Sequence, residues 1–390
     1  MLEKLKEMLK CAFKKLPIDR KLIVFESEGD LSDNTYALFE YLTGKKTETK
    51  YRYVWFVDRE DEARLTMRGK TAFVNKSSRK HYLKRLYCLS VCKYYIYDHN
   101  NYFERMKIQK KKGQNIINLW HGCGVKTMPF ATEPGNIDYL ISLSPLFAEI
   151  QTKFFGIDMA RIFCLGYPRN DYFFMPHNEN QRGVTEKLSQ YKKVILWMPT
   201  FRRSNNPSLD EAYFDSQTGL PILDTEAKLS AFDDYLRELN ILCIFKIHHL
   251  QAALEAYVSQ YTNIITVNDD EIHRMGLQLY QYIMLADCLI TDYSSVATDF
   301  LLLDRPMIFT LDDYEDFKKS RGFCFDDAKQ YLPGYHVYDE AELKQAVYRS
   351  LISGDSYGEQ RKKALSLMHQ YRDGQSCKRI LDLIGLNGET

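Results

Sequence analysis

Short apolar runs, rich in β-branched and aromatic residues, alternate along the chain with longer segments whose apolar positions recur every three or four residues. The short runs predict strands and the longer segments predict helices. Because strands that alternate with helices form parallel sheets covered on both faces, we predict an α/β fold. The predicted strands are 22–26, 52–57, 94–97, 115–120, 138–142, 193–198, 241–247, 263–267, 287–291 and 306–309. The predicted helices are 34–43, 77–90, 144–155, 225–238, 272–285, 294–303, 340–352, 357–371 and 376–384.

A polar stretch at 176–183, which contains Pro176 and Gly183, separates these strands into two sets. Such a stretch is typical of a linker, and a chain of 390 residues is long enough for two domains. We therefore predict two doubly wound, Rossmann-like domains that face a cleft. The N-terminal domain is expected at 22–175, and the C-terminal domain at 190–390, closed by the last helices.

The first 21 residues predict a separate basic amphipathic helix. Seven basic side chains stand against three acidic ones, and the apolar residues form one stripe at helical spacing. A helix of this kind can lie in the headgroup region of an anionic inner membrane surface, here through residues 1–18. It can equally pack on its own domain with a solvated basic face, and the pattern alone does not separate these alternatives.

Composition narrows the class of protein. The 53 basic and 52 acidic side chains give a net charge of +1, so we expect no nucleic-acid partner. Nine cysteines without a Cys-x-x-Cys pair indicate reduced thiols rather than disulfides or a zinc site. No apolar run reaches the ~18 residues of a membrane-spanning helix, and no secretory signal is recognisable. We expect a globular protein that does not cross the bilayer by itself.

Candidate chemistry lies where the predicted strands end, because ligands of parallel α/β sheets collect beyond the carboxyl ends of the strands. His121 follows the strand at 115–120 and precedes the flexible Gly122. An imidazole suits general base catalysis because its ordinary pKa lies near ~6.5. The alternative is a histidine with a structural role.

Lys246 and His248 follow another predicted strand, in the second set. Both side chains can donate hydrogen bonds to phosphate oxygens. The adjacent His248 and His249 also suggest a metal site, but neighbouring strand residues point to opposite faces, so one metal rarely binds both. We expect no metal and no cofactor, since the sequence shows no clustered acidic triad.

The segment from Asp287 to Pro306 predicts a strand, a turn, a helix and a further strand. Ser294 and Ser295 stand where the helix should begin, so either can cap it, and the first backbone N–H groups can bind a phosphate. Asp299 follows about one turn into the helix, where its carboxylate can accept from ribose or alcohol hydroxyls. The Gly-rich phosphate loop patterns are missing from this segment.

Two weaker turns complete the set. The first follows strand 193–198 and can present Pro199, Thr200 and backbone groups to a base or a phosphate. The second is Gly166–Asp171, whose Arg169 can clamp a phosphate, although an arginine after a turn is usually a surface charge. Taken together, these residues predict a cleft for a diphosphate ligand.

In this order, the segments resemble the CDP-glycerol glycerophosphotransferase family, the teichoic-acid glycerol phosphate primases and polymerases. The resemblance covers about 300 residues from about Ile23. The matching motifs are Phe25–Gly29, Ser32–Asn34, Trp120–Gly122, Gly166–Asp171, Pro199–Arg202, Lys246–His248, Leu289–Ser295, Asp299, Arg305–Pro306 and Arg321–Gly322.

The resemblance implies a GT-B-like enzyme, peripheral on the cytoplasmic face of the cell membrane. Such enzymes transfer glycerol phosphate from CDP-glycerol to a hydroxyl of a lipid-linked saccharide acceptor and release CMP. It also implies that His121 and His248 are catalytic. The implied substrate-binding residues are Gly122, Cys123, Gly124, Arg169, Pro199, Thr200, Lys246, Ile247, Ser294, Ser295 and Asp299.

The chain departs from the family pattern at two places. Cys123-Gly124 stands where Thr-Pro often follows His-Gly, and His249 stands where proline often follows the second histidine. A CDP-ribitol donor therefore stays an alternative, as do a nucleotide-sugar glycosyltransferase and a non-catalytic membrane-bound scaffold. The size of the chain favours a primase-like single addition over a long-chain polymerase.

Overall fold

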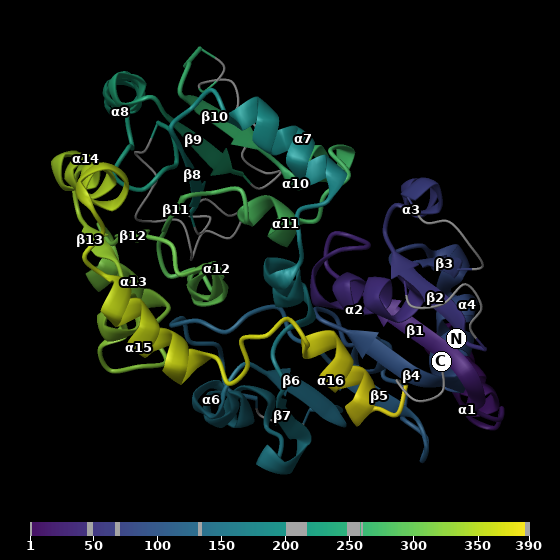
Figure 1. The fold of residues 1–390 in the computed structure, drawn as a ribbon. Helices are drawn as coiled ribbons and strands as arrows, with labels where there is room; N and C mark the ends of the chain where they lie inside the picture. Colours follow the sequence, from purple (N-terminus) through teal and green to yellow (C-terminus); the bar gives the residue numbers. More distant parts are fainter. Residues whose placement is uncertain are drawn as a thin grey trace. The chain divides into compact units, whose positions relative to one another are not determined.

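The computed structural model describes residues 2–44, 50–66, 71–131, 135–199, 217–247, 258 and 260–386 (Figure 1). The chain divides into two compact units. Unit 1 comprises 1–121, 130–174 and 369–390, and unit 2 comprises 122–129 and 175–368.

Unit 1 is built on a seven-stranded sheet in the order β3-β2-β1-β4-β5-β6-β7, in which all neighbouring strands are parallel. Its strands are β1 (Asp19–Glu26), β2 (Arg52–Val57), β3 (Thr71–Asn75), β4 (Cys92–Tyr97), β5 (Asn115–Asn118), β6 (Tyr139–Ser142) and β7 (Ile162–Cys164). Its helices are α1 (Leu2–Lys14), α2 (Asp33–Gly44), α3 (Glu60–Thr66), α4 (Tyr82–Val91), α5 (Tyr102–Arg105), α6 (Pro145–Phe155) and α16 (Ser376–Leu383). Short 3-10 turns add η1 (Arg79–His81), η2 (Met159–Arg161) and η3 (Pro168–Phe174).

Helix α1 packs on α4 and uses only part of its predicted apolar stripe for this contact. Leu9 and Phe13 pack against the buried cluster of strands and helices that includes Leu86 and Leu89 of α4. Leu5 and Met8 remain 51% and 69% exposed. The helix therefore covers its own domain with one side and presents apolar side chains outward with another.

Unit 2 is built on a six-stranded parallel sheet in the order β10-β9-β8-β11-β12-β13. Its strands are β8 (Lys193–Met198), β9 (Ile241–Lys246), β10 (Ile264–Val267), β11 (Cys288–Thr291), β12 (Met307–Thr310) and β13 (Tyr335–Val337). Its helices are α7 (Glu179–Leu188), α8 (Glu226–Leu239), α10 (Asp269–Arg274), α11 (Leu279–Ile283), α12 (Val296–Phe300), α13 (Tyr314–Ser320), α14 (Glu340–Tyr348) and α15 (Gly358–Met368). The 3-10 turns η7 (Leu301–Leu303) and η8 (Ala328–Tyr331) and the π-helical turn η9 (Arg349–Ser353) complete it.

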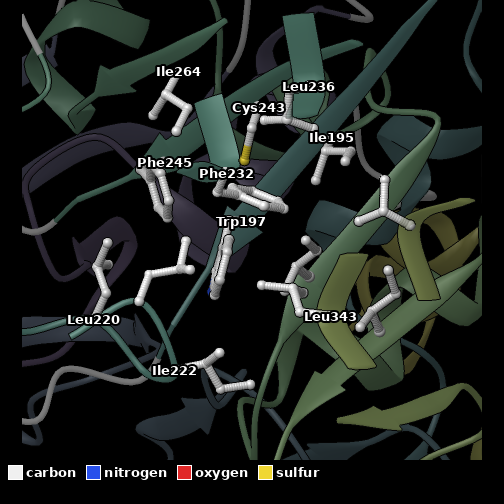
Figure 2. Close-up of a cluster of buried hydrophobic side chains, with 14 of the residues drawn as sticks. Ile195, Trp197, Leu220, Ile222, Phe232, Leu236, Cys243, Phe245, Ile264 and Leu343 are labelled. Atoms are coloured by element: carbon white, nitrogen blue, oxygen red, sulfur yellow. The ribbon is translucent and has the colours of Figure 1, made fainter. Parts of the chain in front are cut away.

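The core of unit 2 lies where the sheet meets α8 and α14, and Figure 2 shows it around Trp197. The Trp197 ring lies 5.0 Å from the Phe245 ring of β9 and 6.1 Å from the Phe232 ring of α8, centroid to centroid. Fully burying one large apolar side chain contributes about 1.5–3 kcal/mol. This packing fixes strands β8 and β9 against α8 in the core of unit 2.

The prediction of two doubly wound α/β units is confirmed, and the differences are local. The strands β3, β7 and β13, which the pattern did not predict, each lie at the edge of a sheet. The predicted helix 272–285 is interrupted between α10 and α11 at Gly276, whose φ of +71° ends the first helix. The predicted linker contains the start of α7, where the side chains of Asn178 and Gln181 form a reciprocal cap. Residues 369–390, expected with the C-terminal domain, belong to unit 1, where α16 packs on α2 and η3.

Candidate active site

Each sheet reverses its winding direction at one point, and loops at such points bind ligands in doubly wound folds. In unit 1 this point lies between β1 and β4, and in unit 2 it lies between β8 and β11. The residues that follow β1 and β4 are 27–32 and 98–101, and those after β8 and β11 begin at Pro199 and Asp292. Pro199 and the turn with Ser294 and Ser295 thus follow the two switch-point strands of unit 2, whereas Lys246 ends the neighbouring strand β9.

His121 follows β5, the neighbour of β4, and its ring is held by the β4 end. Its Nδ1 lies 3.1 Å from the main-chain oxygen of Asp98. A carbonyl oxygen only accepts hydrogen bonds, so Nδ1 carries the proton and Nε2 keeps its lone pair. Burial lowers the pKa of His121, although the hydrogen bond to Asp98 opposes this effect. A neutral imidazole with a basic Nε2 is the form that a general base requires.

A second imidazole, which the sequence analysis missed, lies beside the first. The rings of His99 and His121 are 5.1 Å apart, centroid to centroid. The Nδ1 atom of His99 lies 3.2 Å from the Glu28 carboxylate. Its position two residues after β4, directly at the switch point, was the available signal. The electrostatic interaction with His99 is a further cause that lowers the pKa of His121.

Arg169 is buried and its guanidinium is engaged within unit 1. Its Nη1 donates to both carboxylate oxygens of Asp33, at 2.7 and 2.9 Å, and to the main-chain oxygen of His121 at 3.0 Å. The predicted phosphate clamp is thus an arginine that holds the backbone of the His121 loop.

In unit 2, Pro199 directly follows β8, and Lys246 and Ile247 end β9 and begin its loop. The Lys246 Nζ donates to the Asp269 carboxylate at 2.9 Å and to the main-chain oxygen of Ile247 at 3.4 Å, and Ile247 is buried. Two of the predicted site residues, Thr200 and His248, lie outside the described residues.

The segment after β11 forms the predicted turn and a short helix, α12, which continues into η7. The Ser294 N–H donates to Asp292 at 3.2 Å, and both serines are partly exposed at the helix start. Asp299 is buried, and its carboxylate accepts a 2.5 Å hydrogen bond from the hydroxyl of Tyr280. Asp299 thus braces α12 against α11 in the structure, whereas the sequence suggested that it contacts sugar hydroxyls.

The residues after His121 run along the start of α12, within unit 2. A Cβ atom built on Gly124 would lie 3.1 Å from the Cα of Ser295, closer than most side chains approach backbone. Gly122 has a φ of +147°, which also favours glycine. Backbone hydrogen bonds from Thr127 to Gly322 and from Cys324 to Val125 hold the rest of this segment. Cys123 is buried.

Neither a metal-binding cluster nor a membrane-spanning helix occurs in the described residues. They contain no group of three or more His, Cys, Asp or Glu side chains arranged to hold a metal ion. In that same part of the chain, none of the helices combines the length and the apolarity needed to span a membrane.

Similarity to known proteins agrees with the motifs. A model of the CDP-glycerol:poly(glycerophosphate) glycerophosphotransferase family matches residues 8–386. The chain is 28% identical to the teichoic acid ribitol-phosphate primase of Bacillus spizizenii, over 95% of this chain and 92% of the primase. It is 29% identical to the teichoic acid poly(glycerol phosphate) polymerase of Bacillus subtilis, over 88% of this chain but only 45% of the polymerase.

The fold is also similar to that of a solved structure, the wall teichoic acid polymerase TagF. The TM-score is 0.76 at 24% identity, over 98% of this chain and 94% of that one. This likeness supports the GT-B-like fold class. Since the family model matches nearly the whole sequence, the chain belongs to the CDP-glycerol:poly(glycerophosphate) glycerophosphotransferase family.

Proposed function

We propose that the protein transfers glycerol phosphate from CDP-glycerol to a hydroxyl of a membrane-lipid-linked saccharide acceptor and releases CMP. This transfer would be a step in the synthesis of a teichoic-acid-like or capsule polymer. Family membership supports the reaction class, and the observation that carries the chemistry is the His121 ring. Its Nδ1 is tied to a main-chain carbonyl at a switch-point loop, which leaves Nε2 as the base.

The reaction needs one bond made and one broken at the same phosphorus. The acceptor oxygen bonds to the phosphorus that carries the glycerol, and the bond from that phosphorus to the bridging oxygen of the diphosphate breaks. The bridging oxygen leaves with CMP, and the acceptor proton moves to Nε2 of His121. Transfer of this kind depends on positioning and on stabilising charge.

The charge on the leaving diphosphate calls for cationic and N–H donors. We assign this role to Lys246 and, from the family motif, to the second catalytic residue His248, with Pro199, Thr200, Ile247, Ser294 and Ser295 around the donor. Gly122, Cys123 and Gly124 shape the loop beside the base. Arg169 and Asp299 take supporting roles, because each is buried against a protein partner.

The direct test compares His121→Ala with a matched control. His336 of unit 2 is also an imidazole with a burial-lowered pKa, hydrogen-bonded to a main-chain oxygen, that of Leu332 at 2.8 Å. His121→Ala should lower turnover by about 10²–10⁴-fold, the range of general base catalysis, while calorimetry still detects donor binding. His336→Ala should retain turnover within a few-fold. Equal turnover in both variants would reject His121 as the base.

Ribitol phosphate is the second candidate for the transferred group, because a ribitol-phosphate primase is similar over most of both chains. Release of CMP from CDP-glycerol and CDP-ribitol, with a lipid-linked disaccharide as acceptor, separates the two. A tight preference for UDP-sugars would instead favour a glycosyltransferase, and no turnover with any CDP-alcohol would favour a non-catalytic scaffold.

We propose a primase-like single addition. The similarity to the ribitol-phosphate primase and to the glycerol-phosphate primase of Bacillus subtilis extends over 92% and 76% of those proteins. Mass spectrometry of the product tests this proposal: one or a few added units agree with it, and long polymers contradict it.

We further propose that the protein binds the anionic cytoplasmic face of the cell membrane peripherally, through residues 1–18. Support comes from Leu5 and Met8, which are exposed beside the lysines of α1, and from Leu83 and Tyr87, which are exposed on α4. Deleting α1 would also uncover the core, so the sharper variant is Leu5→Asn with Met8→Asn. It should lose co-sedimentation with phosphatidylglycerol vesicles, whereas Leu367→Asn, an exposed leucine of α15, should not. Equal binding by both would reject the membrane surface proposed for α1.

A further inference from the structure

Three consecutive residues at the start of α2 hold the His121 loop at three points. Asn34 binds the carbonyl before His121, Asp33 fixes the arginine that binds the carbonyl of His121, and Thr35 binds the residue whose carbonyl holds the ring. We infer that Asp33, Asn34 and Thr35 are positioning residues for His121, and that Asn34 is the central one. This inference rests on the proposed role of His121 as the base.

Asn34 uses both ends of its amide for this purpose. It is fully buried, its Nδ2 donates to the Trp120 oxygen at 2.7 Å, and its Oδ1 accepts from the Arg169 N–H at 3.1 Å. The amide therefore links the loop after β5 to the turn η3. An unmade hydrogen bond at a buried carbonyl is costly, so the two loops have little freedom to part.

The Trp120 peptide needs this support because its backbone is unfavourable. Trp120 has a φ of +56°, a region that bulky side chains rarely occupy. Its N–H is fixed by the Asn118 side chain at 2.8 Å, and its ring packs edge-on against Phe155 with centroids 4.8 Å apart. The left-handed Trp120 turns the chain so that the next side chain, His121, reaches back to the β4 end.

The backbone just before and at the start of α2 is strained as well. Asp30, Leu31 and Asp33 all have φ values between +45° and +58°. Together with Trp120 they are four of the eight non-glycine residues with positive φ in the described chain. Strained backbone persists where the surroundings enforce it, and it concentrates at functional sites. Both loops that fix the imidazole therefore carry such strain.

Thr35 completes the arrangement through Asp98. The Thr35 N–H donates to the Asp98 carboxylate at 2.9 Å, and the main-chain oxygen of the same Asp98 accepts from Nδ1 of His121. Asp98 is fully buried. The start of α2 thereby sets the position of the acceptor that selects the Nδ1–H tautomer. The titratable and charged groups around His121 are His99 with its partner Glu28, Asp33, Asp98 and Arg169.

The test replaces the amide and reads the state of the imidazole directly. Asn34→Leu removes both hydrogen bonds and keeps the branched shape of the side chain, and Gln114→Leu is the matched control. Gln114 is a buried amide of the same unit that donates to the main-chain oxygens of Leu89 and Cys92, away from His121. Nitrogen-15 correlation spectra of the histidine rings, with the His121 signals assigned by His121→Gln, report its tautomer.

In the wild type and in Gln114→Leu, His121 should show the Nδ1–H tautomer. In Asn34→Leu it should show a tautomer mixture, and kcat should fall about 100-fold with KM within about threefold, as for a misplaced group. A merely structural role predicts the wild-type tautomer and no greater loss of kcat than in the control. That result would overturn the inference, as would a fall in kcat without a change of tautomer.

Three further variants cover the case in which Asn34→Leu fails to fold. Asn34→Asp keeps the shape and the acceptor for Arg169 but loses the donor to Trp120, so it should also show the mixture. Asp33→Asn keeps an acceptor and suits a positive φ, so it should retain the wild-type tautomer. Asp33→Ala, which has no acceptor, should lose it. If the tautomer changes as expected but the wild-type protein turns over no CDP-alcohol, the proposed function is refuted. The positioning role of Asp33, Asn34 and Thr35 would still hold.

Discussion

Asp171 offers the sharpest test of the tertiary contacts in unit 1. Its two carboxylate oxygens accept from the N–H groups of Ser376 and Cys377, at 2.9 and 2.8 Å. These are the first two residues of α16, and the preceding Gln375 provides no side-chain cap. The carboxylate therefore caps a helix from a turn about 200 residues earlier in the chain.

The magnitude of Asp171→Ala follows from these two bonds. Each buried N–H left without an acceptor costs about 1–3 kcal/mol, and both are buried in the structure. The cost of burying the carboxylate offsets part of the stabilisation by these two hydrogen bonds. This cost is seen in the pKa of Asp171, which burial raises despite the bonds from Cys377 and Ser376. We therefore expect a loss of about 2–3 kcal/mol for the docking of α16, the lower part of the summed range.

Hydrogen exchange of the peptide 376–386 measures this loss locally. A loss of about 2–3 kcal/mol should speed the exchange of the first turn of α16 by about 30- to 150-fold, since 1.4 kcal/mol corresponds to tenfold. Asp171→Asn should behave similarly, because its amide can accept only one of the two bonds. In the control Asp233→Ala, which breaks a 2.7 Å bond to the N–H of Asn263, exchange should rise near residue 263 and stay unchanged in α16. Unchanged α16 exchange in Asp171→Ala would refute the capping role.

Three further predictions concern charge, pH and close packing. Lys76 is buried with its Nζ 3.4 and 3.2 Å from Glu26 and Asp30. Burial opposes its charge, but the carboxylates keep its pKa above the ordinary value. Lys76→Met should cost about 3–5 kcal/mol in urea denaturation, because it strands buried carboxylates; less than 1 kcal/mol would contradict the pairing. The acidic limb of kcat/KM should lie below pH 6.5, since the pKa of His121 is lowered and the neutral form persists to lower pH. Because the pKa of His121 is lower in the folded than in the unfolded chain, the unfolded chain binds the proton first, and His121 lowers the stability of the fold as pH falls below 6.5. An acidic limb of kcat/KM above pH 6.5 would contradict this reasoning. Gly124→Ala should lower kcat up to about tenfold, because the added Cβ contacts Ser295, while Tm changes little. A wild-type kcat would show that the backbone near Ser295 shifts to accept the methyl group without loss of activity.

Local sequence predicted the central strands well. The strands at 52–57 and 193–198 match β2 and β8 at both ends, because each is a nearly continuous apolar run buried on both faces. The strands β7 and β13 have three residues each and lie at sheet edges. A strand that pairs on one side only needs less apolar surface, so its pattern is too weak to recognise.

The candidate site also has features that the sequence predicts and others that it does not. The position of His121 after a strand was predictable, since strand ends follow from the hydrophobic pattern. The partners of Arg169 were not, because Asp33 lies 136 residues earlier in the chain. The same holds for Asp299, whose carboxylate is occupied by Tyr280 of another helix. Residue type suggested ligand contacts for both side chains, whereas burial assigned them partners within the protein.

By itself, therefore, the sequence determined the alternation of strands and helices, the two-unit α/β class and the family motifs. These properties depend on the apolar periodicity of short segments and on residues close together in the chain. Only the tertiary structure decided which charges are already paired, which imidazole nitrogen stays basic, and which loops hold His121. Such properties depend on burial and on hydrogen bonds between distant segments, and they arise only when the chain has packed.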